Sequence, residues 1–397
     1  MASAPPLPVA APALPPSLLR LFAAFLRLGA TAFGGPAMVA YIRRMAVERN
    51  RWLPPQAFDD GVALCQVIPG ATAMQTAAYV GLRVRGVRGA ATSFIGFGLP
   101  AFAAMLVLSV LYAVGHGLPV VVALFGGLRA LVVALIASAL LSFGASSIRH
   151  WSQLVLAALA ATAYVLGVNP VLVILVAAGL GWAFLPRLPA ISSEPARSQL
   201  MQPTVRPVAS ILAAAAAGLV LLWFADRRLA SLTALMLRID LFAFGGGFAS
   251  VPLMYHEIVD VRHWLSGAAL ADGIALGQVT PGPIVITATF VGHQLGGLTG
   301  GALATIGVFL PSFLMVVAIA PHFERLRRSA LFGRMIAGVL CSFVGLLLAV
   351  ALRLAQSVAW TWAHALLTLA AFVALRLKVD VLWVVAGGAL LSLALGR

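Results

Sequence analysis

Charged residues are scarce in this chain, and their scarcity excludes a soluble protein. Only 9% of the 397 residues are charged, 62% are apolar, and mean hydropathy is +1.05. A typical soluble domain has about 25% charged residues. So little charge cannot provide a polar surface, and most of the solvent around this chain must be lipid.

Cysteine and lysine are nearly absent, and no familiar catalytic motif occurs. The two cysteines, Cys65 and Cys341, form neither a metal-ligand nor a disulfide pattern. The chain has no phosphate-binding G-x-x-x-x-G-K-[ST] loop and no H-E-x-x-H. We therefore expect no ATPase, no metal site, no cofactor and no enzyme.

Acidic residues are outnumbered, with 11 of them against 25 Arg and one Lys, which gives a net charge of +15. A basic chain raises the question of nucleic acid. Here the arginines lie mostly in short loops between apolar runs, which is the positive-inside pattern of cytoplasmic loops. We therefore expect no nucleic-acid partner.

Long apolar runs recur along the chain, and a bilayer-spanning helix needs about 20 such residues. Backbone groups in lipid must bond to one another, and no ten-residue alternating segments suggest a barrel, so these runs are predicted helices. The fold class is an all-α polytopic membrane protein with about 9 to 13 spans. The clear runs are 89–114, 119–144, 208–225, 300–320, 335–352 and 379–395, with shorter ones at 151–167, 169–185 and 358–375.

The chain also repeats itself. Residues 27–36 read RLGATAFGGP and residues 238–247 read RIDLFAFGGG; further on, QVIPG at 66–70 is answered by QVTPG at 278–282. Each second copy follows the first by 211 or 212 positions. An internal repeat in an apolar chain indicates a transporter of two homologous halves, with its site where they meet.

Composition sets the predicted boundaries. Residues 1–17, rich in Pro and Ala without Lys or Arg, are expected to be a disordered tail and not a signal peptide. Residues 18–186 form the first transporter repeat and 229–397 the second. Residues 187–228 comprise a linker rich in proline, followed by an unpaired transmembrane helix at 208–225.

The two halves carry their positive charge in different loops. In the first half, arginines gather at 43–51 and 83–88, and the loop near 115–119 has none. In the second half the pattern reverses: 293–299 has none, and arginines crowd 325–334. Opposite loop bias in matching halves predicts inverted topology.

Two segments, 18–47 and 56–82, are interrupted by glycine or proline near the middle. They could cross the membrane as broken helices, or enter and leave on one side as re-entrant hairpins. The sequence fits both arrangements.

The strongest candidate site is the matched pair of breaks. Proline and glycine interrupt a helix, and the new helix after the break presents free N–H groups and a positive dipole end that suit an anion. The alternative is a kinked helix whose hydroxyls bond to backbone. The predicted substrate-binding residues at the breaks are Gln66, Pro69, Gly70, Thr72, Gln278, Thr280, Pro281, Gly282, Pro283 and Thr287.

A second set of substrate-binding candidates lies earlier in each half. Duplicated glycines allow either close helix packing or backbone contact with a ligand. An arginine in a membrane helix faces a cavity or partner, and its planar fork suits an oxyanion, unless it snorkels to the lipid surface. These candidates are Gly34, Gly35, Gly245, Gly246, Gly247, Arg27 and Arg238.

Four carboxylates are candidates for proton coupling, which needs a titratable group at membrane depth. Asp60 and Asp272 occupy matching positions, and helix capping is the alternative role for both. Asp240, inside an apolar run, is the better proton carrier or else a counter-ion for an arginine. Glu257 occurs in one half only.

The motifs F-G-G-P and F-G-G-G, with Q-V-x-P-G, Q-V-T-P-G-P and a following Tyr/Phe-Val-Gly, resemble the two-domain form of the chromate ion transporter family. The resemblance covers about 18–397. The first half has Ala71 where the second has Pro283, a departure from the stronger motif.

The resemblance implies a multi-pass protein of the bacterial inner membrane that exports chromate by exchange with protons and confers chromate resistance. The expected partners are chromate or sulfate, protons and the lipid bilayer, with a homodimer as an option. Rival functions are a sulfate or related oxyanion uptake carrier or channel, and a non-transporting scaffold.

Overall fold

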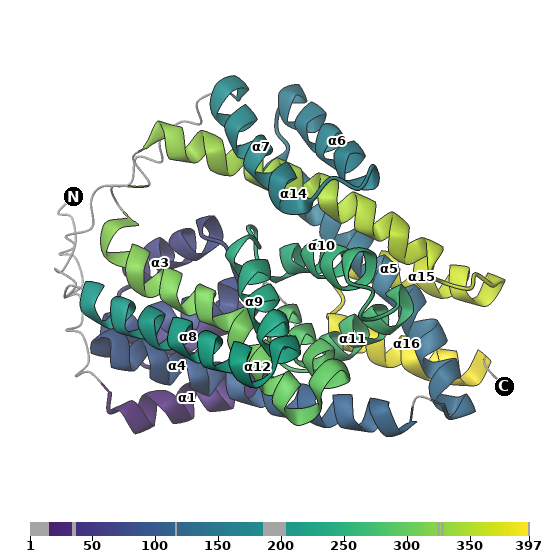
Figure 1. The fold of residues 1–397 in the computed structure, drawn as a ribbon, viewed down its shortest axis with the longest axis horizontal. Coiled ribbons are helices and arrows are strands. Elements are labelled where there is room, and N and C mark those ends of the chain that lie inside the picture. Colours follow the sequence, from purple (N-terminus) through teal and green to yellow (C-terminus); the bar gives the residue numbers. More distant parts are fainter. Residues whose placement is uncertain are drawn as a thin grey trace, which may run out of the picture.

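The computed structural model describes residues 16–33, 37–115, 117–185, 204–323, 326 and 329–395. Within these residues the chain is entirely helical (Figure 1). Most of the expected tail, the glycine pair Gly34 and Gly35, and residues 186–203 of the linker lie outside the described part. Ser17 caps the first helix by accepting from the Arg20 N–H.

The first half begins with two helices and a π-helical turn and continues through five further helices. Three of its helices have proline in the first turn, where the missing N–H costs nothing. The elements are α1 Leu18–Thr31, α2 Ala37–Arg43, the π-helix Arg44–Arg49, α3 Pro55–Val67, α4 Thr72–Gly115, α5 Pro119–Ser147, α6 Trp151–Val165 and α7 Pro170–Phe184.

The second half repeats this order, down to a π-helix at the equivalent position. Helix α8, Val205–Ala225, precedes it. The elements are α9 Arg227–Leu241, the 3-10 turn Gly247–Ala249, α10 Ser250–Tyr255, the π-helix His256–Val261, α11 Gly267–Val279, the 3-10 turn Ile284–Ile286, α12 Thr287–Ile319, the 3-10 turn Ala320–His322, α14 Ala330–Gln356, α15 Trp362–Arg376 and α16 Val381–Leu395.

Five of these helical stretches are long and apolar enough to cross a membrane: α4, α5, α8, residues 284–322 and residues 331–356. Helices α6, α7, α15 and α16 are apolar but shorter. The expectation of a full-length span at 379–395 is therefore wrong, because α16 has only 15 residues. A hydrophobic helix shorter than the bilayer crosses it only with local thinning of the bilayer or snorkelling of flanking residues, or as part of an assembly.

Both long helices fold back on themselves. Helix α4 breaks at Arg85 and Gly86, and α12 breaks at Gly296 and Gly297; Gly86 and Gly297 have positive φ, +62° and +59°. The two helical arms on either side of the first break are in contact, because the Ser93 hydroxyl donates to the Ala77 carbonyl at 2.7 Å. Each half therefore contains a tight helical hairpin.

The two halves interlock. Helices α6 and α7 of the first half pack against α14 of the second, while α15 and α16 of the second half pack against α5 of the first (Figure 1). Helices α4 and α12 lie against each other at the centre. Each half thus completes its packing on helices of the other.

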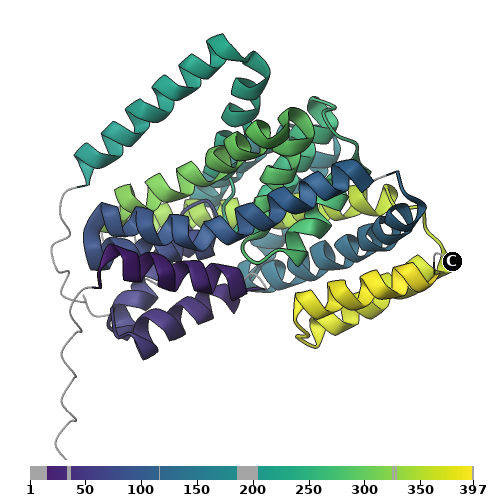
Figure 2. The ribbon, with the colours of Figure 1, turned by 90° about the horizontal axis from the view of Figure 1, so that it is seen from below.

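Helix α8 stands apart. It has no buried residue, and in Figure 2 its teal ribbon leans away from the rest of the molecule. It contacts mainly α9. An apolar helix with no buried residue has a surface suited to lipid.

Candidate functional site: a polar cavity between the halves

A cavity of about 920 Å³ lies between the two halves. The first half contributes α2, α3, the start of α4 and α5 to its walls. The second half contributes α14 and the segments around Gly245–Gly247 and Gln278–Ile284. Both copies of the Q-V-x-P-G motif and the second copy of the glycine motif therefore contribute to one space.

The helical structure is interrupted at both predicted points. Helix α3 ends at Val67 and α4 begins at Thr72; α11 ends at Val279, and helical structure resumes at Ile284. The first residues after each break line the cavity, among them Thr72 and Ile284. First-turn N–H groups have no partner within their helix, and residues of both first turns line this space.

Reciprocal hydrogen bonds tie the two breaks together. The Gly70 N–H donates to the Ala243 carbonyl at 2.8 Å, and the Gly282 N–H donates to the Ala32 carbonyl at 3.1 Å. Ala32 and Ala243 hold matching positions in the repeat, as do Gly70 and Gly282. Each half therefore anchors the break of the other, which is a two-fold arrangement at the level of single bonds.

Glycine is required at positions 70 and 282, where each break hydrogen-bonds to the other half, for two reasons. Gly70 and Gly282 have φ of +118° and +110°, which other residues rarely adopt. A Cβ on Gly70 would lie 2.0 Å from the Ser312 hydroxyl, and one on Gly282 would lie 2.7 Å from the Ala101 Cβ. Ser312 and Ala101 are also repeat counterparts, so the close approach is reciprocal too.

Amide and hydroxyl groups supply the polar part of the cavity wall. Gln66, Thr72, Gln278 and Thr280 all line it. The Nε2 of Gln278 is buried and has no hydrogen-bond partner among the described residues. An unpartnered buried donor costs free energy unless a ligand or water accepts from it. The wall is therefore equipped to donate to an oxyanion.

Sequence reasoning missed two parts of the wall. Helix α5 contributes Ser138, Ser142 and Ser146, spaced four apart and thus on one helix face. Arg43 and Asp59 also line the cavity and form an ion pair with partly exposed side chains. The spacing of four between these serines, in an otherwise apolar helix, is the sequence signal that would have predicted them.

The structure brings together many of the predicted substrate-binding residues and leaves others elsewhere. Pro69, Gly70, Pro281 and Thr287 belong to the breaks without lining the cavity; the Thr287 hydroxyl donates to the Ile284 carbonyl at 2.8 Å. The predicted residues that line the cavity are Gln66, Thr72, Gly245, Gly246, Gly247, Gln278, Thr280, Gly282 and Pro283.

The two predicted arginines do not line the cavity. Arg27 is exposed on α1, and Arg238 of α9 pairs with Glu257 of the π-helix. Glu257 also lies 3.6 Å from Arg262. Glu257 is therefore a nearly buried carboxylate held between two arginines.

Asp240 is completely buried, and its Oδ2 accepts the Ser312 N–H at 2.7 Å. Its Oδ1 has no hydrogen-bond partner in the described part of the chain. The Ser312 hydroxyl in turn accepts the N–H of Ala71, which lines the cavity. A short chain of bonds thus joins this carboxyl group to the start of α4.

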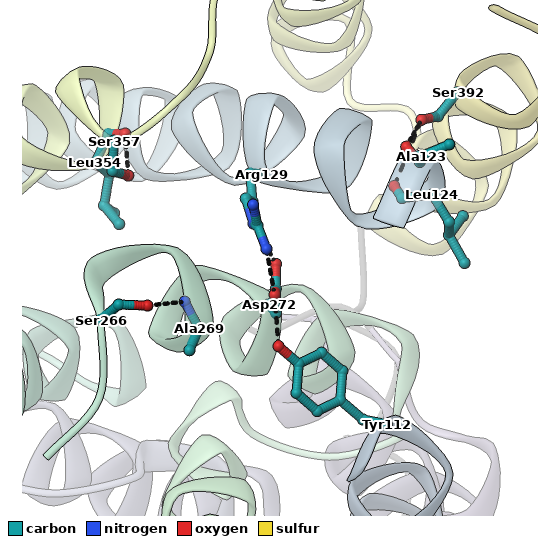
Figure 3. Close-up of polar contacts among 10 residues, drawn as sticks. All are labelled: Tyr112, Ala123, Leu124, Arg129, Ser266, Ala269, Asp272, Leu354, Ser357 and Ser392. Carbon is teal, nitrogen blue, oxygen red and sulfur yellow. Dashed lines mark hydrogen bonds and ion pairs between the residues drawn. The ribbon is translucent and has the colours of Figure 1, made fainter. Parts of the chain in front are cut away.

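The matched carboxylates Asp60 and Asp272 are each the sixth residue of a helix, α3 and α11, so the capping role is wrong for both. Asp272 accepts two bonds from Arg129 of α5, at 2.6 and 2.8 Å, and one from the Tyr112 hydroxyl at 2.8 Å (Figure 3). Asp60 is half-buried in α3.

A helical chain with membrane-length spans and a cavity between two repeated halves has the architecture of a multi-pass membrane transporter. The chain belongs to the chromate transporter family, whose sequence profile matches residues 19–182 and again residues 230–393. The family consists of transporters and not enzymes.

Three relatives illustrate the match. An uncharacterized transporter of Methanocaldococcus jannaschii is 41% identical over 384 residues, covering 96% of this chain and 94% of that one. Chromate transport proteins of Pseudomonas aeruginosa and Cupriavidus metallidurans are 33% and 32% identical, covering 87% and 95% of this chain and 83% and 93% of their own. No solved structure matches the chain.

Proposed function

We propose that this chain exports chromate across the bacterial inner membrane by alternating access, in exchange for protons, and so confers chromate resistance. The observation that carries the proposal is the cavity between the halves, with a helix start from each half and the free amide of Gln278 in its wall. The membership of the family supports the choice of substrate.

The chemistry of the wall fits a tetrahedral dianion. An oxyanion leaving water needs several hydrogen-bond donors in place of its hydration shell, and backbone N–H groups at helix starts supply them without added charge. The wall also contains the hydroxyls of Ser138 and Ser142 on α5. The Thr72 and Thr280 hydroxyls donate to the Cys65 and Gly277 carbonyls instead. Sulfate has nearly the same size and charge, so it is the natural competitor.

The membrane potential favours outward movement of a dianion. Moving one elementary charge across 100 mV is worth about 2.3 kcal/mol, and the cell interior is negative. Chromate in the cytoplasm is therefore already driven outward, and inward proton movement would add to this force.

We assign proton coupling to Asp240. A fully buried carboxyl group with one unpartnered oxygen is costly to keep charged, so its proton occupancy depends on its surroundings. Its bonds through Ser312 to Ala71 connect it to the cavity. The other half has Gly29 and Ala101 at the two matching positions, so only one half carries this polar pair.

Flux in reconstituted liposomes tests the proposal. We expect purified protein to move labelled chromate, unlabelled sulfate to compete, and an imposed pH gradient to accelerate the flux. The Asp240→Asn variant, which keeps an oxygen for the Ser312 N–H, should transport without responding to the pH gradient. No chromate flux from a monodisperse protein would contradict the proposal and favour a scaffold; net inward sulfate transport would favour the uptake carrier.

A further inference from the structure

The cluster of Asp272, Arg129 and Tyr112 joins the two halves just beyond the cavity. Asp272 comes from the second half and its two partners from the first; its side chain is 1% exposed. The Tyr112 ring packs edge-on against Phe125 and Phe290, with centroids 5.0 Å apart in both pairs. Figure 3 shows the three polar side chains converging from three helices.

The cluster lies close to the cavity floor. Arg129 precedes Leu135, the first cavity-lining residue of α5, by six positions, which is about 9 Å along a helix. Asp272 precedes Gly277, a cavity-lining residue of α11, by five positions, or about 8 Å. The bidentate ion pair therefore closes the space between α5 and α11 beneath the cavity.

The matching place in the other half is open. The repeat counterparts of Asp272, Arg129 and Tyr112 are Asp60, Leu340 and Phe323. Helix α11 packs along α5, whereas α3 makes no comparable contact with α14. Instead α3 and α14 both line the cavity, and Leu340 is one of the lining residues. Two places related by the repeat thus differ: one is closed by an ion pair and the other forms cavity wall.

The two ends of the cavity differ in charge as well. Arg43 lies in the wall, and Val379 in the wall directly follows Lys378 in a loop that the positive-inside pattern assigns to the cytoplasm. Tyr112 lies at the other end, near the loop 115–119, which has no Arg or Lys. The open end is therefore on the cytoplasmic side and the closed end on the outer side.

We propose that Asp272, Arg129 and Tyr112 form the outer gate of the transporter, closed here while the cavity faces the cytoplasm. This rests on the proposed transport by alternating access. In the opposite state α3 closes against α14 with Leu340 at the contact, α11 separates from α5, and the ion pair breaks. One gate is thus ionic and the other apolar, so the gates differ although the halves match.

Side-specific labelling tests the gate without chromate. In a background carrying Cys65→Ser and Cys341→Ser, a Ser138→Cys reporter in the cavity wall is treated with an impermeant maleimide in inside-out and right-side-out vesicles. We expect fast labelling from the cytoplasmic face and slow labelling from the outer face. Asp272→Asn should raise the outer rate about tenfold or more, because removing one partner of a buried ion pair costs more than the 1.4 kcal/mol of a tenfold change.

The matched control is Asp60→Asn, at the same repeat position, where Leu340 is the repeat counterpart of Arg129, and it should leave the outer rate unchanged. The swapped pair Arg129→Asp with Asp272→Arg should restore slow outer labelling, which a variant that merely unfolds could not do. Equal labelling from both faces in the parent, an unchanged outer rate in Asp272→Asn, or fast outer labelling in the swapped pair would overturn the gate. Absent chromate flux with intact sidedness would instead overturn only the proposed substrate.

Discussion

At the scale of single residues, the side chain that says most about the ligand is Gln278. It lies in the last turn of α11, just before the break in the helix, and it lines the cavity. Its Nε2 has no partner among the described residues. A neutral donor held in this way binds an anion without the cost of burying a second charge.

Replacing this amide by a carboxylate should destroy anion binding. We expect Gln278→Glu to weaken chromate affinity by about tenfold to hundredfold or more, since a hydrogen bond to a charged group contributes about 1.5–3 kcal/mol and repulsion adds to its loss. Chromate binding by calorimetry or by flux competition measures this. Gln294→Glu is the matched control, because Gln294 also has an unpartnered Nε2 but lies outside the cavity wall. Equal effects in the two variants would contradict the role of Gln278.

Arg238 offers a second residue-scale test, because the structure pairs it with Glu257. If Arg238 binds substrate, Arg238→Ala raises the chromate concentration needed for half-maximal flux. If its role is the ion pair, the variant leaves that concentration unchanged and lowers the thermal stability in detergent, because Glu257 loses a partner. The loss should be smaller than the roughly 3–5 kcal/mol of a buried pair, since the Arg238 side chain is 41% exposed. We expect the second result, and the first would contradict it.

Of the residues that the sequence nominates, duplicated ones such as Gln66, Gly245 and Gln278 line the cavity, whereas Arg27 and Arg238 do not. Duplication marks a position in the fold. The arginines are nominated by the cost of a charge in a membrane helix, which does not say which way the side chain points. Arg129 was overlooked although a lone arginine in the run 119–144 was a visible signal.

At the scale of elements, the interrupted helices decide the geometry of the site. Proline and glycine at matching places predicted both breaks, and the structure confirms them at 68–71 and 280–283. The sequence could not predict the reciprocal bonds from Gly70 to Ala243 and from Gly282 to Ala32, because they join segments far apart in the chain. Inverted topology and re-entrant entry stay predictions.

Substitution of a break glycine that hydrogen-bonds to the other half should disturb the site more than substitution of a glycine elsewhere. We expect Gly282→Ala to lose most chromate flux and to lower the stability by about 1–2 kcal/mol from left-handed backbone strain alone, with the contact against Ala101 adding to it. Gly218→Ala on α8 is the control, since a Cβ there meets open space, and it should be neutral or stabilising by up to about 1 kcal/mol. Melting in detergent and flux in liposomes measure both; an active and stable Gly282→Ala would contradict the account.

At the scale of the whole molecule, the repeat predicted two halves but not how they combine. A repeat reveals that each half has the same helices, and it leaves open whether those helices pack within a half or across. The structure has α6 and α7 on α14, and α15 and α16 on α5. The halves therefore depend on each other for their packing, which could not be deduced from hydropathy.

This interlocking predicts the behaviour of separated halves. Expressed alone, residues 1–203 and residues 204–397 should each fail to give a monodisperse membrane protein, because each lacks the helices that cover its long central span. Expressed together, they should copurify and move chromate. A first half that is stable and monodisperse by itself would contradict the packing across the halves.

The central claim is that one oxyanion binds between the helix starts of the two halves. Locating chromium by its anomalous scattering in crystals grown with chromate tests this directly. The account predicts the metal centre within the cavity, between the Ala71–Thr72 turn and the Gly282–Pro283 turn, with Gln278 beside it. Chromium located at the Arg238–Glu257 pair, with the cavity empty, would contradict it.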